Sequence, residues 1–170
     1  RAAIEAGAGL INDVFALRRG GALRAAAEMG VPVCLMHMSG VPRVMQDKPG
    51  YDDVFSEVRT FLHDRANDCE KAGISPGNII LDPGFGFGKT LQHNIELFRN
   101  LPAFVRGSYP VLVGVSRKAM IGHLTGRDTR DRVSGSIVAA ALAAQMGAAI
   151  IRVHDVGETS DALKVATALS

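Results

Sequence analysis

Five short, nearly continuous apolar runs, each separated from the next by a stretch with helical character, constrain the fold of this 170-residue chain most strongly. Continuous apolarity is typical of strands that are covered on both faces, and strands that alternate with helices are typical of βα units on a parallel sheet. The sequence therefore predicts an α/β fold. The predicted strands are residues 9–14, 31–36, 78–81, 110–115 and 149–153.

The stretches between these runs predict five helices. Glycines at positions 30 and 73 are predicted to end the first two. The fourth helix is apolar almost all round, so it must be covered on more than one side, either by neighbouring helices or by a second subunit. The predicted helices are residues 20–29, 52–72, 91–104, 131–146 and 158–169.

The length of the chain leaves two architectures open. A βα unit takes about 30 residues and a (β/α)8 barrel about 250 residues, so this chain holds roughly five units. One possibility is a complete five-stranded doubly wound sheet. The other is a truncated TIM barrel that consists of the last five units and lacks the first three. Residues 1–6 read as helix and lead directly into the first apolar run, which favours the truncated barrel.

Composition argues against several classes of partner and compartment. A net charge of +2 and an aromatic content of 5% without tryptophan give little for binding nucleic acid. The longest apolar stretch, residues 137–151, is shorter than the roughly 20 residues that cross a bilayer, so no membrane span is expected. The two cysteines are far apart in sequence, and residues 1–5 do not resemble a signal peptide. We therefore expect a reducing, cytoplasmic compartment.

Polar side chains lie at the carboxyl end of every predicted strand. In parallel α/β proteins, this edge of the sheet is where functional sites are built. The side chains concerned are Asn12, Asp13, His37, Asp82, Ser116, Arg117, Lys118, Arg152, His154 and Asp155.

The stretch 82–90, Asp-Pro-Gly-Phe-Gly-Phe-Gly-Lys-Thr, resembles two nucleotide-binding motifs but matches neither. A P-loop requires glycine where this chain has Pro83, and the glycine spacing is not that of the dinucleotide fingerprint. The remaining interpretation is a carboxylate at a strand end followed by a glycine-rich loop. Asp82 could accept two parallel hydrogen bonds from a pterin-like or guanine-like ring edge, or it could cap local backbone N–H groups.

Two further groups could bind anions. Arg117 and Lys118 are adjacent cations that need solvent, an anion or a ring carbonyl as partner. Arg152 and His154 alternate along one strand, so they share a face and could bind one phosphate between them. No pair of histidines or carboxylates has the spacing of metal ligands.

Taken together, five segments resemble the dihydropteroate synthase family, in order and over the whole chain. They are residues 10–14, 34–38, 81–89, 113–118 and 151–156. The resemblance implies a TIM barrel, of which residues 1–170 would form one partial pterin-binding domain. It also implies the reaction of 6-hydroxymethyl-7,8-dihydropterin pyrophosphate with 4-aminobenzoate, which gives 7,8-dihydropteroate and pyrophosphate in folate biosynthesis and which sulfonamides inhibit.

Carried over residue by residue, the resemblance implies three groups of contacts. Asn12, Asp82 and Lys118 would hold the pterin ring, and Met36 and Gly114 would line its pocket. Arg152 and His154 would bind the pyrophosphate. Phe87 and Ser116 would place the aminobenzoate, with Arg117 beside them. Within these groups, Asp82, Lys118, Arg152 and His154 are the expected catalytic residues.

The family resemblance further implies Mg²⁺, with a protein ligand in the missing N-terminal units, and a homodimer formed through residues 131–146. Residues 38–50 would form a loop over the active face.

In this reaction the enzyme must stabilise the departing pyrophosphate anion, and no covalent nucleophile is needed. This chain alone is expected to have little or no synthase activity.

Two alternatives stay open. One is a non-catalytic remnant that retains pterin binding, and the other is a related pterin-binding methyltransferase. Residues 116–118 and 152–154 argue against the methyltransferase, because a methyl carrier has no pyrophosphate to bind.

Overall fold

The computed structural model describes residues 1–40 and 50–170. The loop expected over residues 38–50 therefore lies mostly outside the described residues. The helices and strands are, in chain order, α1 (Ala2–Glu5), β1 (Ile11–Asp13), α2 (Ala22–Met29), β2 (Val33–Met36), α3 (Val54–Lys71), β3 (Ile79–Asp82), α4 (Leu91–Arg99), α5 (Leu101–Val105), β4 (Leu112–Val113), α6 (Ala119–Thr125), α7 (Val133–Gln145), β5 (Ile150–Ile151) and α8 (Val156–Ala168). Two short 3-10 helices, Pro76–Asn78 and Thr129–Asp131, precede β3 and α7.

The five strands are all parallel and lie side by side in chain order. Pairing joins β1 to β2, β2 to β3 and β4 to β5, and a parallel bridge between Leu81 and Val111 connects the two groups. A doubly wound sheet reverses its strand order at a switch point, whereas neighbouring strands of a TIM barrel follow one another in sequence. The strand order therefore decides between the two predicted architectures in favour of barrel units.

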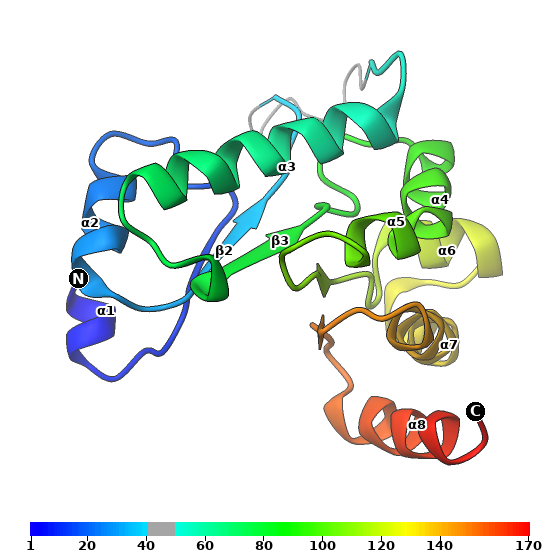
Figure 1. Cartoon of the computed structure of the whole chain (residues 1–170). Helices are drawn as coiled ribbons and strands as arrows, with labels where there is room; N and C mark the ends of the chain where they lie inside the picture. The colour runs from blue at the N-terminus through cyan, green and yellow to red at the C-terminus, as the bar shows by residue number, and fades with distance from the viewer. Residues whose placement is uncertain (41–49) are drawn as a thin grey trace.

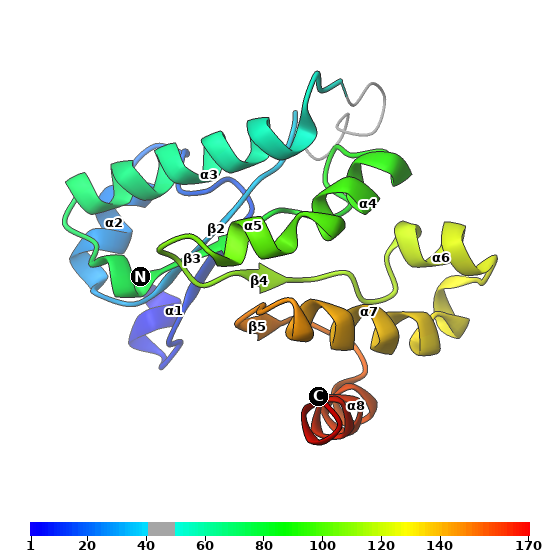
Figure 2. The ribbon, with the colours of Figure 1, turned by 45° about the vertical axis from the view of Figure 1, so that its right-hand side comes forward.

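The longer helices follow the row of strands around its outside, from α3 at the top of the views to α8 at the bottom (Figures 1 and 2). α3 lies across β2 and β3, and α4 to α8 continue the layer toward the C-terminus. Local sequence signals set several helix boundaries. The Asp53 carboxylate caps α3 by accepting a hydrogen bond of 2.9 Å from the backbone N–H of Ser56, and α2 and α6 end at Gly30 and Gly126 in the left-handed conformation.

Each strand has one face in the main core and one face on the inner side of the barrel. Val33, Leu35, Ile79 and Leu81 belong to the large core that the helices cover. Cys34, Ile80 and Leu112 form a separate small cluster on the opposite face. Because side chains alternate along a strand, residues in register with this cluster point into the barrel interior.

The predicted helices differ from the observed ones in two places. The predicted helix 91–104 is two helices, α4 and α5, because Pro102 cannot donate the backbone hydrogen bond that a continuous helix needs there. Helix α6 was not predicted, since Gly122 weakens an already short helical pattern. Among the described residues, no helix is long and apolar enough to cross a membrane.

Candidate functional site

The predicted pterin residues of β1 to β4 share the inner face at the carboxyl ends of the strands. Asn12 is in register with Cys34, and Met36 is in register with Asp82. Arg152 has the same parity in the segment that follows β5, and its guanidinium lies over Gly114, where a Cβ would come within 3.0 Å of Nη2. The structure therefore brings these residues to one edge of the strands, as the sequence predicts.

Asp82 is the most buried acidic group at this edge, with 2% of its surface exposed. Its Oδ1 accepts a hydrogen bond of 2.8 Å from the backbone N–H of Gly84, and its Oδ2 lies 3.9 Å from Nη2 of Arg152. Burial raises the pKa of Asp82, while the Gly84 N–H and the charges of Lys118 and Arg152 oppose that shift. One oxygen thus caps the loop, and the other faces the cationic side of the site.

Lys118 lies beside this carboxylate and above the loop that follows β3. Its ammonium donates a hydrogen bond to the carbonyl oxygen of Phe85 and lies 4.8 Å from the centre of the Phe87 ring. Burial lowers the pKa of Lys118 to about 8, and Asp82 partly opposes this shift. Lys118 and Phe87 are both half-buried, so a planar ligand could reach them.

His154 and Ser116 form a second pair, between the segments that follow β5 and β4. Nδ1 of His154 lies 3.0 Å from Oγ of Ser116, and the backbone N–H of His154 donates to the same oxygen at 3.2 Å. The neighbours of Arg152 are instead Gly114 and Asp82. The binding of one phosphate by Arg152 and His154 together remains a prediction.

Arg117 is held between three structural elements. Its guanidinium forms an ion pair with Asp155, with Nε 3.0 Å from Oδ2, and this hydrogen bond lowers the pKa of Asp155. Its backbone N–H donates to Ser136 of α7 at 2.9 Å, and its carbonyl accepts from Arg132 at 2.9 Å. These contacts hold Arg117 at a φ of +54°, which is unusual for a residue with a side chain.

Asp13, at the end of β1, has a local hydrogen-bonding role. Asp13 accepts hydrogen bonds from the backbone N–H groups of Phe15 and Leu17 at 3.1 and 2.8 Å, so it shapes the loop after β1.

The two cysteines are free and buried, and burial raises the pKa of Cys34 to about 12. Within residues 1–40 and 50–170, no three His, Cys, Asp or Glu side chains form a group that could hold a metal ion.

Sequence reasoning assigned no role to two buried residues, His37 and Lys89. Lys89 was considered in the rejected P-loop motif and His37 as one of the polar strand ends, and both lie in segments that carry the family resemblance, but neither received a role. Both side chains are buried, and Nζ of Lys89 lies 3.0 Å from Nδ1 of His37. The available sequence signal was that Lys89 follows five loop residues that are all glycine or phenylalanine, because such neighbours favour burial.

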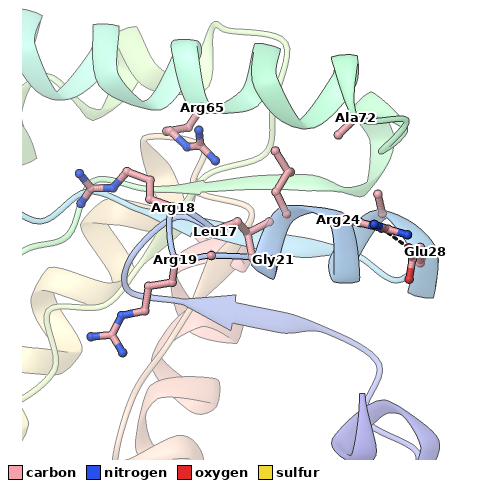
Figure 3. Close-up of a pocket in the computed structure, with 11 residues that line it drawn as sticks. Leu17, Arg18, Arg19, Gly21, Arg24, Glu28, Arg65 and Ala72 are labelled. Carbon is pink, nitrogen blue, oxygen red and sulfur yellow. Dashed lines mark hydrogen bonds and ion pairs between the residues drawn. The ribbon is translucent and has the colours of Figure 1, made fainter.

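A groove of about 790 Å³ between α2 and α3 is lined by four arginines but lies apart from the site residues described above (Figure 3). The guanidinium groups point in different directions, and each already has a partner. Arg24 pairs with Glu28, Arg65 pairs with Asp68, Arg18 lies over the Phe61 ring, and Arg19 lies over the Phe15 ring. The groove therefore does not gather its charges on one ligand.

The chain is similar in sequence to a known family of enzymes. The sequence model of the family described as pterin binding enzyme matches residues 1–154. The chain is 51% identical over 168 residues to the dihydropteroate synthase of Escherichia coli strain K12, and 50% identical over 165 residues to that of Haemophilus influenzae. These alignments cover 99% and 97% of this chain but 60% of each relative.

Solved structures of dihydropteroate synthases have the same fold over the same extent. The enzyme of Stenotrophomonas maltophilia with bound imidazole superposes with a TM-score of 0.97 at 52% identity, covering 99% of this chain and 64% of that one. The Yersinia pestis enzyme in complex with a sulfonamide drug gives 0.95 at 48% identity, covering 98% and 61%. The Xanthomonas albilineans enzyme in complex with 7,8-dihydropteroate gives 0.93 at 51% identity, covering 99% and 62%. This chain thus spans about three fifths of the length of these proteins.

Proposed function

The chain belongs to the pterin binding enzyme family, and from this premise we propose that it carries the pterin and pyrophosphate sites of a dihydropteroate synthase. The reaction would join 6-hydroxymethyl-7,8-dihydropterin pyrophosphate to 4-aminobenzoate and release pyrophosphate. The observation that carries the proposal is the buried Asp82 carboxylate at a strand end, with Lys118 and Arg152 beside it. About 50% identity to known synthases supports the same reading.

In this proposal the pterin ring lies on the inner face of the barrel. The Asp82 carboxylate would accept hydrogen bonds from the ring N–H groups, since each carboxylate oxygen can accept more than one hydrogen bond. Lys118 would donate to a ring acceptor. Asn12 would bind the ring edge, and Met36 and Gly114 would leave a flat space for the ring.

The anionic leaving group would lie toward β5. Pyrophosphate departure leaves cationic character on the pterin methylene carbon, so stabilising the departing anion lowers the barrier. The exposed half of the Arg152 side chain and the exposed His154 are available for this role. The amine of 4-aminobenzoate then forms the new C–N bond as the C–O bond breaks, and the amine loses a proton.

The aminobenzoate would lie between Phe87 and Ser116, the position that a sulfonamide would share. The Phe87 ring lies under Lys118, at the mouth of the proposed ring pocket. Arg117 would lie beside the aminobenzoate without holding it, because its guanidinium is bound to Asp155 and its backbone to Ser136 and Arg132. The family also leads us to expect Mg²⁺, but the described residues offer no metal-binding group and we assign no residue of this chain to it.

We also propose that a second copy of the chain covers the groove between α4, α6 and α7. The groove has a volume of about 530 Å³ and is lined mainly by apolar side chains. Leu124, Val138 and Leu142 are 60%, 58% and 43% exposed there, which is costly for a free surface. A cytoplasmic location and the absence of nucleic-acid and membrane partners stay predictions.

The first test is binding, measured by calorimetry with dihydropterin pyrophosphate and the chain as it is. We expect binding to be lost or weakened at least about 30-fold by Asp82→Asn, since a charge-assisted pair of hydrogen bonds is removed. Asp161→Asn, which alters an exposed carboxylate on α8, is the matched control and should bind like the unmodified chain. Equal affinity of Asp82→Asn and the unmodified chain would rule the pterin site out.

A competition experiment separates the synthase from a methyltransferase. Free pyrophosphate should compete with dihydropterin pyrophosphate in a synthase, because both occupy the site near Arg152. A pterin methyltransferase would bind the pterin without such competition.

A further inference from the structure

Beyond the residues assigned to substrates, we propose that Lys89 is a positioning residue of the pterin site. Its ammonium group joins the end of β2 to the loop formed by residues 83–88, and this loop holds both Asp82 and Lys118 in place. We call these contacts of the Lys89 ammonium the Lys89 clamp. Its effect on pterin binding rests on the proposed function, but the clamp itself can be tested without a ligand.

Four acceptors surround the Lys89 ammonium. Nζ lies 3.0 Å from Nδ1 of His37, 3.4 Å from the His37 carbonyl oxygen, 3.0 Å from the Gly84 carbonyl oxygen and 3.1 Å from the Phe87 carbonyl oxygen. The residue is 4% exposed. The clamp therefore links a strand end with both ends of the glycine-rich loop.

These partners suit an ammonium group better than an amine. An ammonium has three N–H donors and no acceptor, and all four neighbours can accept. Burial and the nearby Lys89 charge lower the pKa of His37 to about 3, so the ring is neutral and Nδ1 is free to accept a hydrogen bond. No ion pair of 4.0 Å or less joins Lys89 to a carboxylate in the described part of the chain.

The opposite side of the same loop serves the pterin site. The Gly84 N–H donates to Asp82, the Phe85 carbonyl accepts from Lys118, and the Phe87 ring lies under Lys118. Lys89 binds the carbonyls of Gly84 and Phe87, which flank these groups. Removing the ammonium would free the loop carbonyls that fix the orientation of all three contacts.

A buried charge without a carboxylate partner is costly, and here four hydrogen-bond acceptors offset that cost. Burial lowers the pKa of Lys89 to about 7, with Asp82 opposing and Lys118 reinforcing the shift. Perturbed ionisable groups of this kind concentrate at functional sites. The contacts of Lys89 with the loop give a reason for keeping a lysine with a lowered pKa at this position.

The test compares Lys89→Met with Lys164→Met, whose lysine is exposed and pairs with Asp161. Three quantities are measured for each variant: the melting temperature, the amide hydrogen exchange of residues 84–88, and the affinity for dihydropterin pyrophosphate. We expect Lys89→Met to remain folded, to exchange the loop amides at least tenfold faster while α3 is unchanged, and to lose at least tenfold in affinity. Loop protection and affinity within twofold of the Lys164→Met control would overturn the proposal.

A second measurement on the unmodified chain covers the case in which Lys89→Met does not fold. NMR titration follows the His37 ring nitrogens and the amides of residues 84–88 between pH 5 and 9 in the absence of ligand. The clamp predicts that Nδ1 of His37 carries no proton and accepts a hydrogen bond, and that all transitions in these signals share one midpoint. A proton on Nδ1, or independent midpoints, would overturn it. If the clamp is present but neither the unmodified chain nor the control binds the pterin, the proposed function fails while the clamp stands.

Discussion

A Cβ placed on Gly84 would lie 1.8 Å from the carbonyl oxygen of His37. The backbone after β3 thus packs directly against the backbone after β2, with no room for a side chain between them. Gly84 also has a φ of +70°, which side chains disfavour. Two independent constraints therefore require glycine at this position.

We expect Gly84→Ala to destabilise the fold by about 2 kcal/mol or more, because both the clash and the positive φ must be relieved by moving the loop. Pterin affinity should fall with it, since the Gly84 N–H binds Asp82. Gly77→Ala is the matched control, because a Cβ there has open space. Chemical denaturation of the two variants measures the difference, and equal unfolding midpoints would contradict the close packing.

His37 should make the fold sensitive to acid. Its pKa falls from 6.5 to about 3 on folding, because burial and the charges of Lys89 and Arg18 disfavour the protonated ring. Between these values the unfolded chain binds a proton that the folded chain does not, so the free energy of unfolding decreases as the pH falls from 6.5 toward 3, by up to about 1.4 kcal/mol per pH unit.

Denaturation curves at a series of pH values test this contribution. In His37→Gln the free energy of unfolding should depend less steeply on pH below 6.5, by up to about 1.4 kcal/mol per pH unit. His123→Gln, at an exposed position on α6, should leave this dependence unchanged. Identical slopes in the two variants would show that His37 is not the group responsible.

Arg152→Ala should weaken the inhibition by free pyrophosphate about 10-fold to 100-fold, the range expected when a charge-assisted contact to an anion is lost. Arg24→Ala removes an exposed arginine in the groove between α2 and α3 and should have no effect. Competition calorimetry against the bound pterin provides the measurement. Unchanged inhibition by pyrophosphate would remove Arg152 from the anion site.

Val138→Glu should prevent self-association, because it places a charge at the centre of the apolar groove that α6 and α7 line. Sedimentation velocity over a range of concentrations measures the oligomeric state. Leu169→Glu adds the same charge at another exposed apolar residue, after α8, and should associate like the unmodified chain. A monomeric unmodified chain would refute the proposed interface.

The sequence predicted the fold well where one simple periodicity dominated. The continuous apolar runs located all five strands, and polar residues at their ends marked the edge that carries Asp82 and Arg152. Alternation along a strand showed that Arg152 and His154 share a parity, but it could not show that His154 packs against Ser116. That contact depends on how two segments 38 residues apart meet in space.

The same limit explains the other differences. Arg117 was expected to need solvent, an anion or a ring carbonyl as partner, and the partner in the structure is Asp155, on a distant segment. Lys89 had no role assigned from the sequence, because only the folded chain brings the His37 ring to its ammonium. Pro102 is a sequence signal for a break after α4. The helical pattern on both sides of Pro102 led to the prediction of one continuous helix.

The alternation of the strands also restricts how the length of this chain can change. One residue inserted within β3 before Asp82 would turn the carboxylate outward into the helix-covered core and bring Leu81 to the inner face. Insertions and deletions should therefore be confined to the connections between strands and helices. Within a strand, only changes of two residues would preserve the parity on which the pterin site depends.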